Sequence, residues 1–457
     1  MSSSTKAIRT VSQWGNRFPL FLQGLAALFV LIEFVAFLVK PHGDFLLHRE
    51  FGRRLLAHEY LYRGGMHVPY PPFWAVVNAP LSLLPAGAAK SLFLLLGISA
   101  VAAILAMLNA LSKTSMPLDR DRTRTTATLA LLFTCPFLLR DLDDGGQNLV
   151  LLALSLGGIY FWTRGRLIGA GASLGAAVAL KCTPALLLLY FAWKREWRMA
   201  SITLAFALLY SLTPILWQGP AFYALHMRAW ETQVVWSLTA PNPSVGILGP
   251  EKLQNRALRP ALARYLMALP PGHPGRFEGR GYIDFGHLSP PAAARVIKLL
   301  MLLLLAGVAW TFRYPARPES VRCSAQSGPP SPEESACVLW EGATVLLLML
   351  LVSPITWGQH CVSALPITYL LIRSAIAGKE MPRRTITFLF LIAGLILGTD
   401  RLFLGRHFAL LLESYHLITL GLLALLIVAL AAGKRVRSGL YVKRTVEEAD
   451  LRLETTP

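Results

Sequence analysis

Acidic, basic and amide side chains collect in a few short stretches of an otherwise apolar chain. One stretch begins at Asp44, a second covers residues 141–148, and a third is Gln359-His360. A single lysine, Lys181, interrupts a long apolar stretch. A carboxylate can take the proton from an attacking hydroxyl group, and cations can hold a departing anion. These residue types therefore suit a group transfer to a hydroxyl group with an anionic leaving group.

The composition indicates that a membrane domain carries these residues. The chain has 457 residues, of which 54% are hydrophobic and 15% are charged, against about 25% charged residues in an ordinary globular protein. A soluble enzyme, a disordered protein and a secreted disulfide scaffold are excluded. The net charge is +19, but no basic stripe with interleaved aromatic residues supports nucleic-acid binding. We interpret the excess charge as a determinant of topology and as contact with anionic lipid.

The apolar segments predict an all-α polytopic membrane protein with roughly 12 transmembrane helices. The first segment, 18–39, is longer than the apolar core of a signal peptide, so we expect an uncleaved span. The further predicted spans are 86–111, 125–140, 147–163, 199–217, 294–313, 338–357, 360–377, 385–399 and 408–432.

The distribution of Lys and Arg predicts the orientation of the bundle. Basic residues precede the first span and fill the short loops between later spans, which places these loops in the cytoplasm. We therefore expect a cytoplasmic N-terminus (1–17), a transmembrane domain (18–432) and a cytoplasmic basic tail (433–457). The long outer loops would be 40–72 and 218–293.

Three segments depart from this simple pattern. Residues 167–193 have basic residues at both ends and are interrupted by Lys181-Cys182-Thr183-Pro184. Because proline interrupts helical hydrogen bonding, we expect a broken hairpin of two short helices, with one long tilted helix as the alternative. The run 73–84 is too short for a span and is expected to be interfacial or re-entrant. The Pro/Ser-rich segment 314–336 is expected to be a flexible inner loop.

The residues that could do chemistry fall on the predicted outer face. An outward-facing site has no access to cytosolic nucleotide donors, so its donor would arrive through the lipid phase, most simply as a polyprenyl phosphate ester. Phosphate leaves as a stable anion, so one carboxylate suffices, whereas glycoside hydrolases typically use two. We expect no cofactor and no metal ion.

A set of short motifs follows one another between residues 40 and 365. They are Gly43-Asp44-Phe45, Gly52-Arg53-Arg54-Leu55-Leu56, Tyr70-Pro71-Pro72-Phe73, Pro80-Leu81-Ser82-Leu83-Leu84-Pro85, Gly146-Gln147-Asn148, Ala179-Leu180-Lys181-Cys182-Thr183-Pro184 and Ser353-Pro354-Ile355-Thr356-Trp357. In this order they resemble glycosyltransferase family 87. That family belongs to the GT-C superfamily and is typified by polyprenyl-phosphate-mannose-dependent mannosyltransferases. The resemblance implies a GT-C-like bundle with interfacial helices on its outer face.

Three positions differ from the family pattern. His58 replaces the glycine of a Gly-x-x-x-Tyr step, Asn242-Pro243-Ser244 stands where the family has Asn-Gln-Ser, and Gln359-His360 stands where it has paired histidines. These positions bear on the identity of the donor and the acceptor.

The resemblance implies that Asp44 is the catalytic base, with Glu50 as a fallback. Residues 46–57 would form an amphipathic helix in the membrane interface that holds Asp44 at headgroup level. Lys181, together with His360 or an arginine of the outer face, would bind the donor phosphate. The alternatives are a lysine that snorkels to the surface for Lys181 and a role in orienting Asp44 for His360.

Five further residues are candidates for substrate binding. For two of them, Gln147 and Asn148, capping of the following helix is the alternative role. For Tyr70 the alternative is a structural role in the return of the loop to the membrane. The complete set is Tyr70, Gln147, Asn148, Asn242 and Ser244.

The predicted function is that of a plasma-membrane glycosyltransferase. A hexose, with mannose as the first choice, would pass with inversion from a polyprenyl phosphate donor to a hydroxyl group of a glycolipid or envelope glycan on the outer face. Its partners would be this donor, the acceptor and membrane lipids, and no nucleic acid. One alternative is a transporter or lipid flippase, which would show inverted repeats and charges in the middle of the membrane. The other is a non-catalytic subunit of an envelope-synthesis complex.

Overall fold

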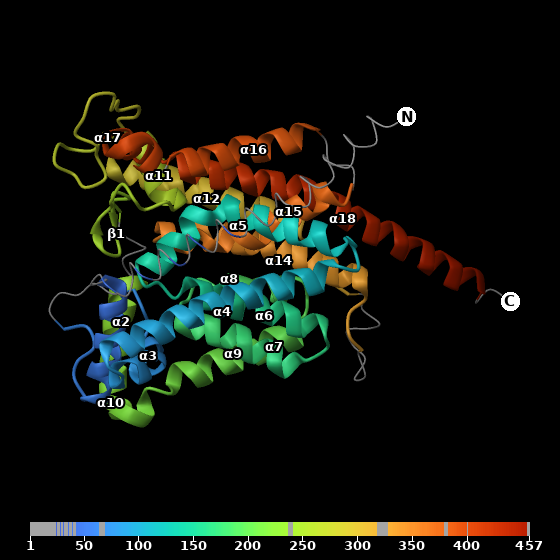
Figure 1. The fold of residues 1–457 in the computed structure, drawn as a ribbon, viewed down its shortest axis with the longest axis horizontal. Coiled ribbons are helices and arrows are strands. Elements are labelled where there is room, and N and C mark those ends of the chain that lie inside the picture. Colours follow the sequence, from blue (N-terminus) through green and yellow to red (C-terminus); the bar gives the residue numbers. More distant parts are fainter. Residues whose placement is uncertain are drawn as a thin grey trace, which may run out of the picture.

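Helices form nearly all of the regular structure in the computed structural model (Figure 1). The structure describes residues 43–63, 69–235, 241–317, 328–378, 383–399 and 401–454, together with five isolated positions between residues 24 and 39. The predicted cytoplasmic segment 1–17 and most of the predicted first span lie outside the described residues.

The helices form an elongated bundle, with α2, α10, β1 and α17 at one end, here called the α2 end (Figure 1). The last helix leaves the bundle at the opposite end, here called the tail end. The elements are α2 (Gly43–Leu56), α3 (Phe73–Leu83), α4 (Ala86–Ser112), α5 (Arg120–Asp143), α6 (Asn148–Thr163), α7 (Leu167–Leu180), α8 (Ala185–Trp193), α9 (Trp197–Leu212), α10 (Ile215–Val234), β1 (Val245–Gly246), β2 (Gly249–Pro250), α11 (Leu258–Leu266), α12 (Pro290–Thr311), α14 (Pro332–Val352), η2 (Gly358–Ala364), α15 (Leu365–Ile376), α16 (Arg383–Gly398), α17 (Arg401–Ser414) and α18 (Leu417–Glu454).

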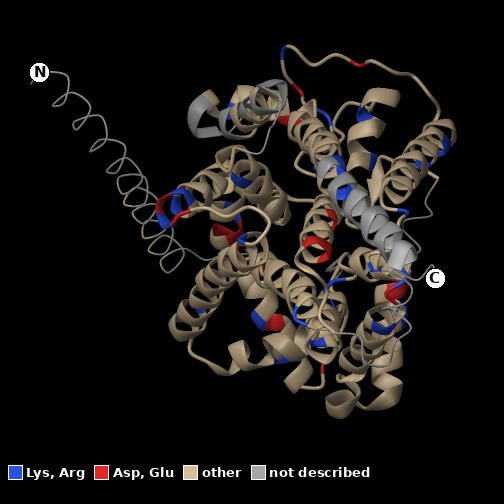
Figure 2. Cartoon of the chain, turned by 90° about the vertical axis from the view of Figure 1, so that its right-hand side faces the viewer, with Lys and Arg blue, Asp and Glu red and all other residues tan. Residues whose placement is uncertain are grey.

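In the described part of the chain, five helices are long and apolar enough to cross a membrane: α4, α5, α12, α14 and residues 417–434 of α18. A sixth candidate is the pair α9 and α10, which is bent by 91°. Figure 2 shows how few charged residues the helices carry. The prediction of a helical membrane bundle is confirmed, whereas the number of roughly 12 spans stays a prediction.

The central helix of the bundle is α14, most of which is buried. It begins at Pro332, because Ser331 and Glu334 form a capping box in which each side chain accepts a hydrogen bond from the other residue's backbone N–H. The prediction of a loop over 314–336 is therefore wrong for residues 332–336. The predicted span 338–357 is also wrong at its end, since Ser353 turns to an extended conformation before Pro354.

The predicted span 408–432 is divided between α17 and α18. His416 separates the two helices and has a left-handed φ of 48°. Next to it, the Tyr415 hydroxyl donates to the Gly281 carbonyl at 2.6 Å and accepts from the Ile283 N–H at 3.1 Å. These contacts to a distant segment hold the turn open, which explains why the local apolar pattern misplaced the boundary.

The predicted break within residues 167–193 is confirmed, since α7 ends at Leu180 and α8 begins at Ala185. Along α7 and α9, Gly171 faces Ile202 and Gly175 faces Phe206, so these two helices run parallel and closely packed. The intervening α8 must therefore return the chain to the end at which α7 began. This is the broken hairpin, and the alternative of one long tilted helix is wrong.

Several short basic segments lie together at the tail end. Glu196, which precedes α9, accepts hydrogen bonds from Trp162 at 3.4 Å and from Arg317 at 3.0 Å. The guanidinium group of Arg437 in α18 lies 5.3 Å from the ring centre of Phe312. The turns around α6, α9 and α12 thus share one side of the bundle with the start of the tail.

At the opposite end, α2 packs on α3. Arg49 donates to the carbonyl groups of Leu81 and Leu84, at 3.1 and 2.7 Å, where α3 ends. The two helices approach most closely at Gly52, where an added Cβ atom would overlap the backbone of Asn78. Glycine at position 52 therefore sets the distance between the helix that carries Asp44 and its neighbour.

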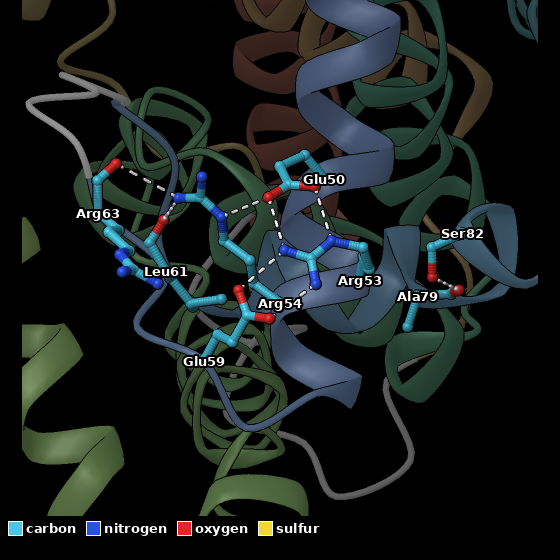
Figure 3. A network of polar contacts seen from close by, with 8 residues as sticks. All are labelled: Glu50, Arg53, Arg54, Glu59, Leu61, Arg63, Ala79 and Ser82. Carbon is cyan, nitrogen blue, oxygen red and sulfur yellow. Dashed lines mark hydrogen bonds and ion pairs between the residues drawn. The ribbon is translucent and has the colours of Figure 1, made fainter.

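An ion-pair network covers the outer side of α2 (Figure 3). Glu50 accepts hydrogen bonds from Arg53 at 2.8 Å and from Arg54 at 2.7 Å, and Arg53 also reaches Glu59 at 2.8 Å. Arg54 continues to the carbonyl group of Leu61 at 2.9 Å. The Arg53 hydrogen bond is the largest of the effects that lower the pKa of Glu50 to about 2. The network joins α2 to the turn that follows it.

We predict that Gly52→Ala destabilises the protein, because the new methyl group must push α2 away from α3. Overpacking of this kind costs about 1–3 kcal/mol. The control is Gly87→Ala in α4, where nothing lies within 4 Å of an added Cβ atom. Alanine is the better helix former, so this control should keep or raise the melting temperature. Thermal unfolding in detergent measures both, and an unchanged midpoint for Gly52→Ala would contradict the packing argument.

Candidate functional site

A cavity of about 710 Å³ lies at the α2 end of the bundle. It is walled by the first turn of α2, the end of α5, the segment 248–256, the turn before η2, and the ends of α16, α17 and α18. Its polar lining residues include Asp44, Tyr70, Arg140, Lys252, Arg256, Gln359 and His360. Residues from opposite ends of the sequence therefore meet in one space.

Asp44 lies in the first turn of α2, where a carboxylate suits the positive end of the helix dipole. Its Oδ2 atom accepts a hydrogen bond from Gln359 Nε2 at 3.3 Å. Burial raises the pKa of Asp44 above its ordinary value, while this hydrogen bond and the charges of Lys181 and Arg140 act in the opposite direction. The result is a half-buried carboxylate that faces the cavity and is more basic than a solvated aspartate.

Lys181 lies in the break between α7 and α8 and belongs to a chain of polar contacts. Its Nζ atom is 3.0 Å from His360 Nε2 and donates to Asn148 Oδ1 at 3.4 Å. Asn148 in turn donates to Asp141 Oδ1 at 2.8 Å. On the other side of the ring, His360 Nδ1 lies 3.1 Å from the backbone nitrogen of Trp357 and 3.2 Å from the Ile355 carbonyl, so both ring nitrogens have partners within the protein. The structure thus brings the predicted residues Lys181, His360 and Asn148 together.

Asp141 is a member of this chain that the sequence did not single out. Its carboxylate accepts from the backbone N–H groups of Asn148 and Leu149, at 3.4 and 3.1 Å, and so caps α6. A turn through Gly145, with φ of 69°, folds Asp141 back over the helix start. The capping residue stands seven positions before the helix, outside the usual N-cap position, so no local signal could reveal it. The prediction that Gln147 or Asn148 caps this helix is wrong.

The remaining predicted substrate-binding residues are divided. Tyr70 lines the cavity and stacks on Trp74, with ring centres 4.1 Å apart. Gln147 does not line it and instead donates to the side chain of buried Asn78. Asn242 and Ser244 are not among the lining residues, and Asn242 Oδ1 accepts hydrogen bonds from the Ser244 N–H and hydroxyl groups within one turn. These two residues shape the segment that leads to the cavity and do not line it.

One wall of the cavity depends on a junction between residues 255–256 and residues 354–356, which lie far apart in the sequence. The backbone N–H of Arg256 donates to the Thr356 carbonyl at 2.7 Å, and the Thr356 N–H donates to Asn255 Oδ1 at 2.9 Å. Asn255 also donates to the Pro354 carbonyl at 3.1 Å. The Ser-Pro-x-x-Trp motif is therefore held by the outer segment, and Lys252 and Arg256 enter the cavity, where sequence reasoning had not placed them.

Two other acidic side chains near α2 and α5 form ion pairs with arginine. Asp144 pairs with Arg140 at 2.7 Å, and Glu50 is bound by Arg53 and Arg54 away from the cavity. Within the described ranges, no three His, Cys, Asp or Glu side chains are placed to hold a metal ion. Asp44, by contrast, lines this cavity beside Gln359 and forms no ion pair with an arginine among the described residues.

The chain is similar to one protein family, to one named enzyme and to one solved structure. The model of glycosyltransferase family 87 matches residues 68–328. A relative from Mycolicibacterium smegmatis, the polyprenol-phosphate-mannose-dependent alpha-(1-2)-phosphatidylinositol mannoside mannosyltransferase, is 28% identical over 362 residues, which are 75% of this chain and 70% of the relative. The crystal structure of ArnT from Cupriavidus metallidurans bound to undecaprenyl phosphate is 15% identical, with a TM-score of 0.38 over 91% of this chain and 78% of that one.

The family match, and not the structural match, decides the family of the chain. A TM-score of 0.38 carries no argument about the fold, so the GT-C-like arrangement stays a prediction. The family match ends before Gln359 and begins after Asp44, so the role of the carboxylate rests on its geometry. The match nevertheless covers more than half of the 457 residues. The chain therefore belongs to glycosyltransferase family 87.

Proposed function

We propose that this glycosyltransferase moves a hexose from a polyprenyl phosphate donor to a hydroxyl group of a glycolipid or envelope glycan, with inversion. The observation that carries the proposal is the half-buried Asp44 carboxylate, which faces a cavity of about 710 Å³ together with Gln359, His360 and several cations. A cavity of this size has room for a sugar and the groups on either side of it.

Mannose is the proposed sugar. The relative from Mycolicibacterium smegmatis is named as a polyprenol-phosphate-mannose-dependent enzyme, and it shares 28% of its residues with this chain over the aligned part. The proposed acceptor is a lipid-linked glycan, since the cavity lies at the end of a membrane bundle, within reach of lipid headgroups.

The proposed reaction is a single displacement. The Asp44 carboxylate takes the proton of the acceptor hydroxyl group, whose oxygen forms a bond to the anomeric carbon. The bond from that carbon to the phosphate oxygen breaks, and polyprenyl phosphate leaves with the electron pair. Its charge needs cations rather than a general acid.

Lys181 and His360 remain the proposed binding residues for the donor phosphate. His360 lines both the cavity and a small pocket beside it that also contains Lys181. In the structure the Lys181 ammonium group is held by His360 and Asn148. It therefore supplies positive potential through a fixed network, and donor phosphate would meet it across His360.

The proposed location is the outer face of the plasma membrane, with both termini in the cytoplasm. The support is the grouping of basic turns at the tail end, opposite the cavity. In a cysteine-free background, Leu46→Cys next to the cavity should react with a membrane-impermeant maleimide on intact cells. Arg164→Cys at the tail end should react only after lysis. The reverse pattern would refute the outward site.

We predict that Asp44→Asn lowers transfer by about 10²–10⁴-fold, the usual contribution of a general base. The assay supplies radiolabelled polyprenyl-phosphate-mannose and a membrane lipid extract to purified protein. The control is Glu50→Gln on the same helix, which loses a carboxylate that is already paired with arginine and should keep most of the activity.

This assay tests two statements separately, namely that Asp44 is the base and that the protein transfers a lipid-linked sugar. Equal transfer by wild type and Asp44→Asn would remove Asp44 from the mechanism. Loss of activity in Glu50→Gln with retention in Asp44→Asn would assign the base to Glu50. Absence of transfer by wild type with several lipid-linked sugars would refute the proposed function.

We also predict a pH effect at Gln359. Its hydrogen bond stabilises the Asp44 carboxylate and thereby lowers the pKa of that group. Gln359→Leu should therefore raise the pKa of Asp44, so that the carboxylate is protonated, and activity is lost, at a higher pH than in wild type. The measurement is kcat between pH 4 and 8, with about one unit expected as the order of the shift. An unchanged acid limb would show that Gln359 does not act on the base.

A further inference from the structure

Two cations in the cavity have no part in the reaction as proposed so far. Lys252 follows β2 and is exposed, and Arg256 lies four residues later. Both line the cavity, on a wall formed by the outer segment rather than by α2. The cations whose charges act on Asp44 are instead Lys181 and Arg140.

The charges of Lys252 and Arg256 are uncompensated by contact. Among the residues that the structure describes, no carboxylate forms an ion pair with either side chain, whereas Arg140 is paired with Asp144 at 2.7 Å. Glu413 lines the same cavity from α17. A partly buried guanidinium group without an anion is a ready binding partner for one.

Arg256 is also held in position by contacts that do not include an ion pair with a carboxylate. Its backbone is fixed on both sides, by the N–H bond to Thr356 and by its carbonyl group, which accepts from the Thr419 hydroxyl at 2.9 Å. The guanidinium group lies 5.4 Å from the ring centre of Phe137 and flanks Gly358. Packing on an aromatic face orients the guanidinium group.

The proposed displacement requires a phosphate site away from the base. In an inverting transfer, the attacking oxygen and the leaving phosphate lie on opposite sides of the anomeric carbon. Besides Lys181 and Arg140, whose charges act on Asp44, the cavity offers Lys252 and Arg256 from the outer segment, with Arg256 next to Arg140 at Gly358. Arginine can bind two phosphate oxygens at once, and lysine adds a point charge.

We propose that Lys252 and Arg256 form a subsite for the phosphate group of a lipid substrate. The inference rests on the proposed function and assigns this group a place within the same cavity. Two sources carry the required chemistry, namely the phosphate monoester of the polyprenyl carrier and the phosphodiester of a phospholipid-based acceptor.

The test is direct binding to purified protein in an uncharged maltoside detergent, measured by native mass spectrometry. The probes are farnesyl phosphate for the carrier and phosphatidylinositol for the acceptor, with farnesol as the phosphate-free control. We expect wild type to bind at least one phosphate lipid over farnesol. Lys252→Met and Arg256→Met should each weaken that binding about tenfold or more, the effect of losing one charge-assisted contact.

Matched variants keep this test independent of folding and of catalysis. Arg256→Lys retains the charge but not the two-pronged contact, so it should weaken binding less than Arg256→Met does. Arg280→Met removes a charge from an exposed position of the same outer segment and should leave binding unchanged. Asp44→Asn should bind the phosphate lipid as wild type does, even though transfer is lost. Loss of binding to one probe only identifies the carrier or the acceptor as the source.

The proposal is overturned if Lys252→Met and Arg256→Met bind both probes as wild type does, or if Arg280→Met weakens binding as much as they do. It is likewise overturned if wild type binds farnesol as well as farnesyl phosphate and does not bind phosphatidylinositol. Because these measurements involve no sugar transfer, they can fail while the proposed function stands, and they can succeed where no transfer is found.

Discussion

Lys181 carries its charge into the break between two apolar helices, and the site depends on how that charge is compensated. The ammonium group contacts His360 and Asn148, and Asn148 passes the interaction on to Asp141, which also caps α6. An ion taken out of water is tolerated only when its hydrogen bonds are made elsewhere, and loss of one partner leaves an uncompensated charge. The contacts therefore join α5, α6, the α7–α8 break and η2 at the floor of the cavity.

This arrangement also sets the pKa of Asp44, the proposed base. Asp44 is buried enough for its pKa to be raised, while Gln359 and the nearby cations keep the charged form accessible. The first turn of α2 is held there from two sides, by the close approach at Gly52 and by Arg49 at the end of α3. A short surface helix thus acquires a fixed position against the membrane bundle, which suits the role proposed for Asp44.

The two ends of the bundle differ in chemistry, and this difference suits a substrate carried by lipid. The tail end holds basic turns around Glu196, whereas the α2 end holds the cavity with carboxylates, amides and cations. Apolar helices lie between them, and several expose large hydrophobic side chains, as lipid-facing helices do. A donor with a long apolar tail can place its phosphate at the α2 end while the tail stays in the hydrocarbon.

The sequence by itself determined the helical membrane class, the break at Lys181–Pro184 and the helix that starts near Asp44, because apolar periodicity, proline and flanking charge act over neighbouring residues. Of the residues it proposed for the site, Lys181 contacts His360 and Asn148 in the structure, and its charge acts on Asp44. Only the tertiary structure decided that Asp141 caps α6, that Tyr415 and His416 interrupt the last apolar segment, and that Lys252 and Arg256 reach the cavity while Asn242 and Ser244 do not. Each of these depends on contacts between segments that lie far apart in the chain or on a turn that folds back, and such contacts leave no pattern in the local sequence.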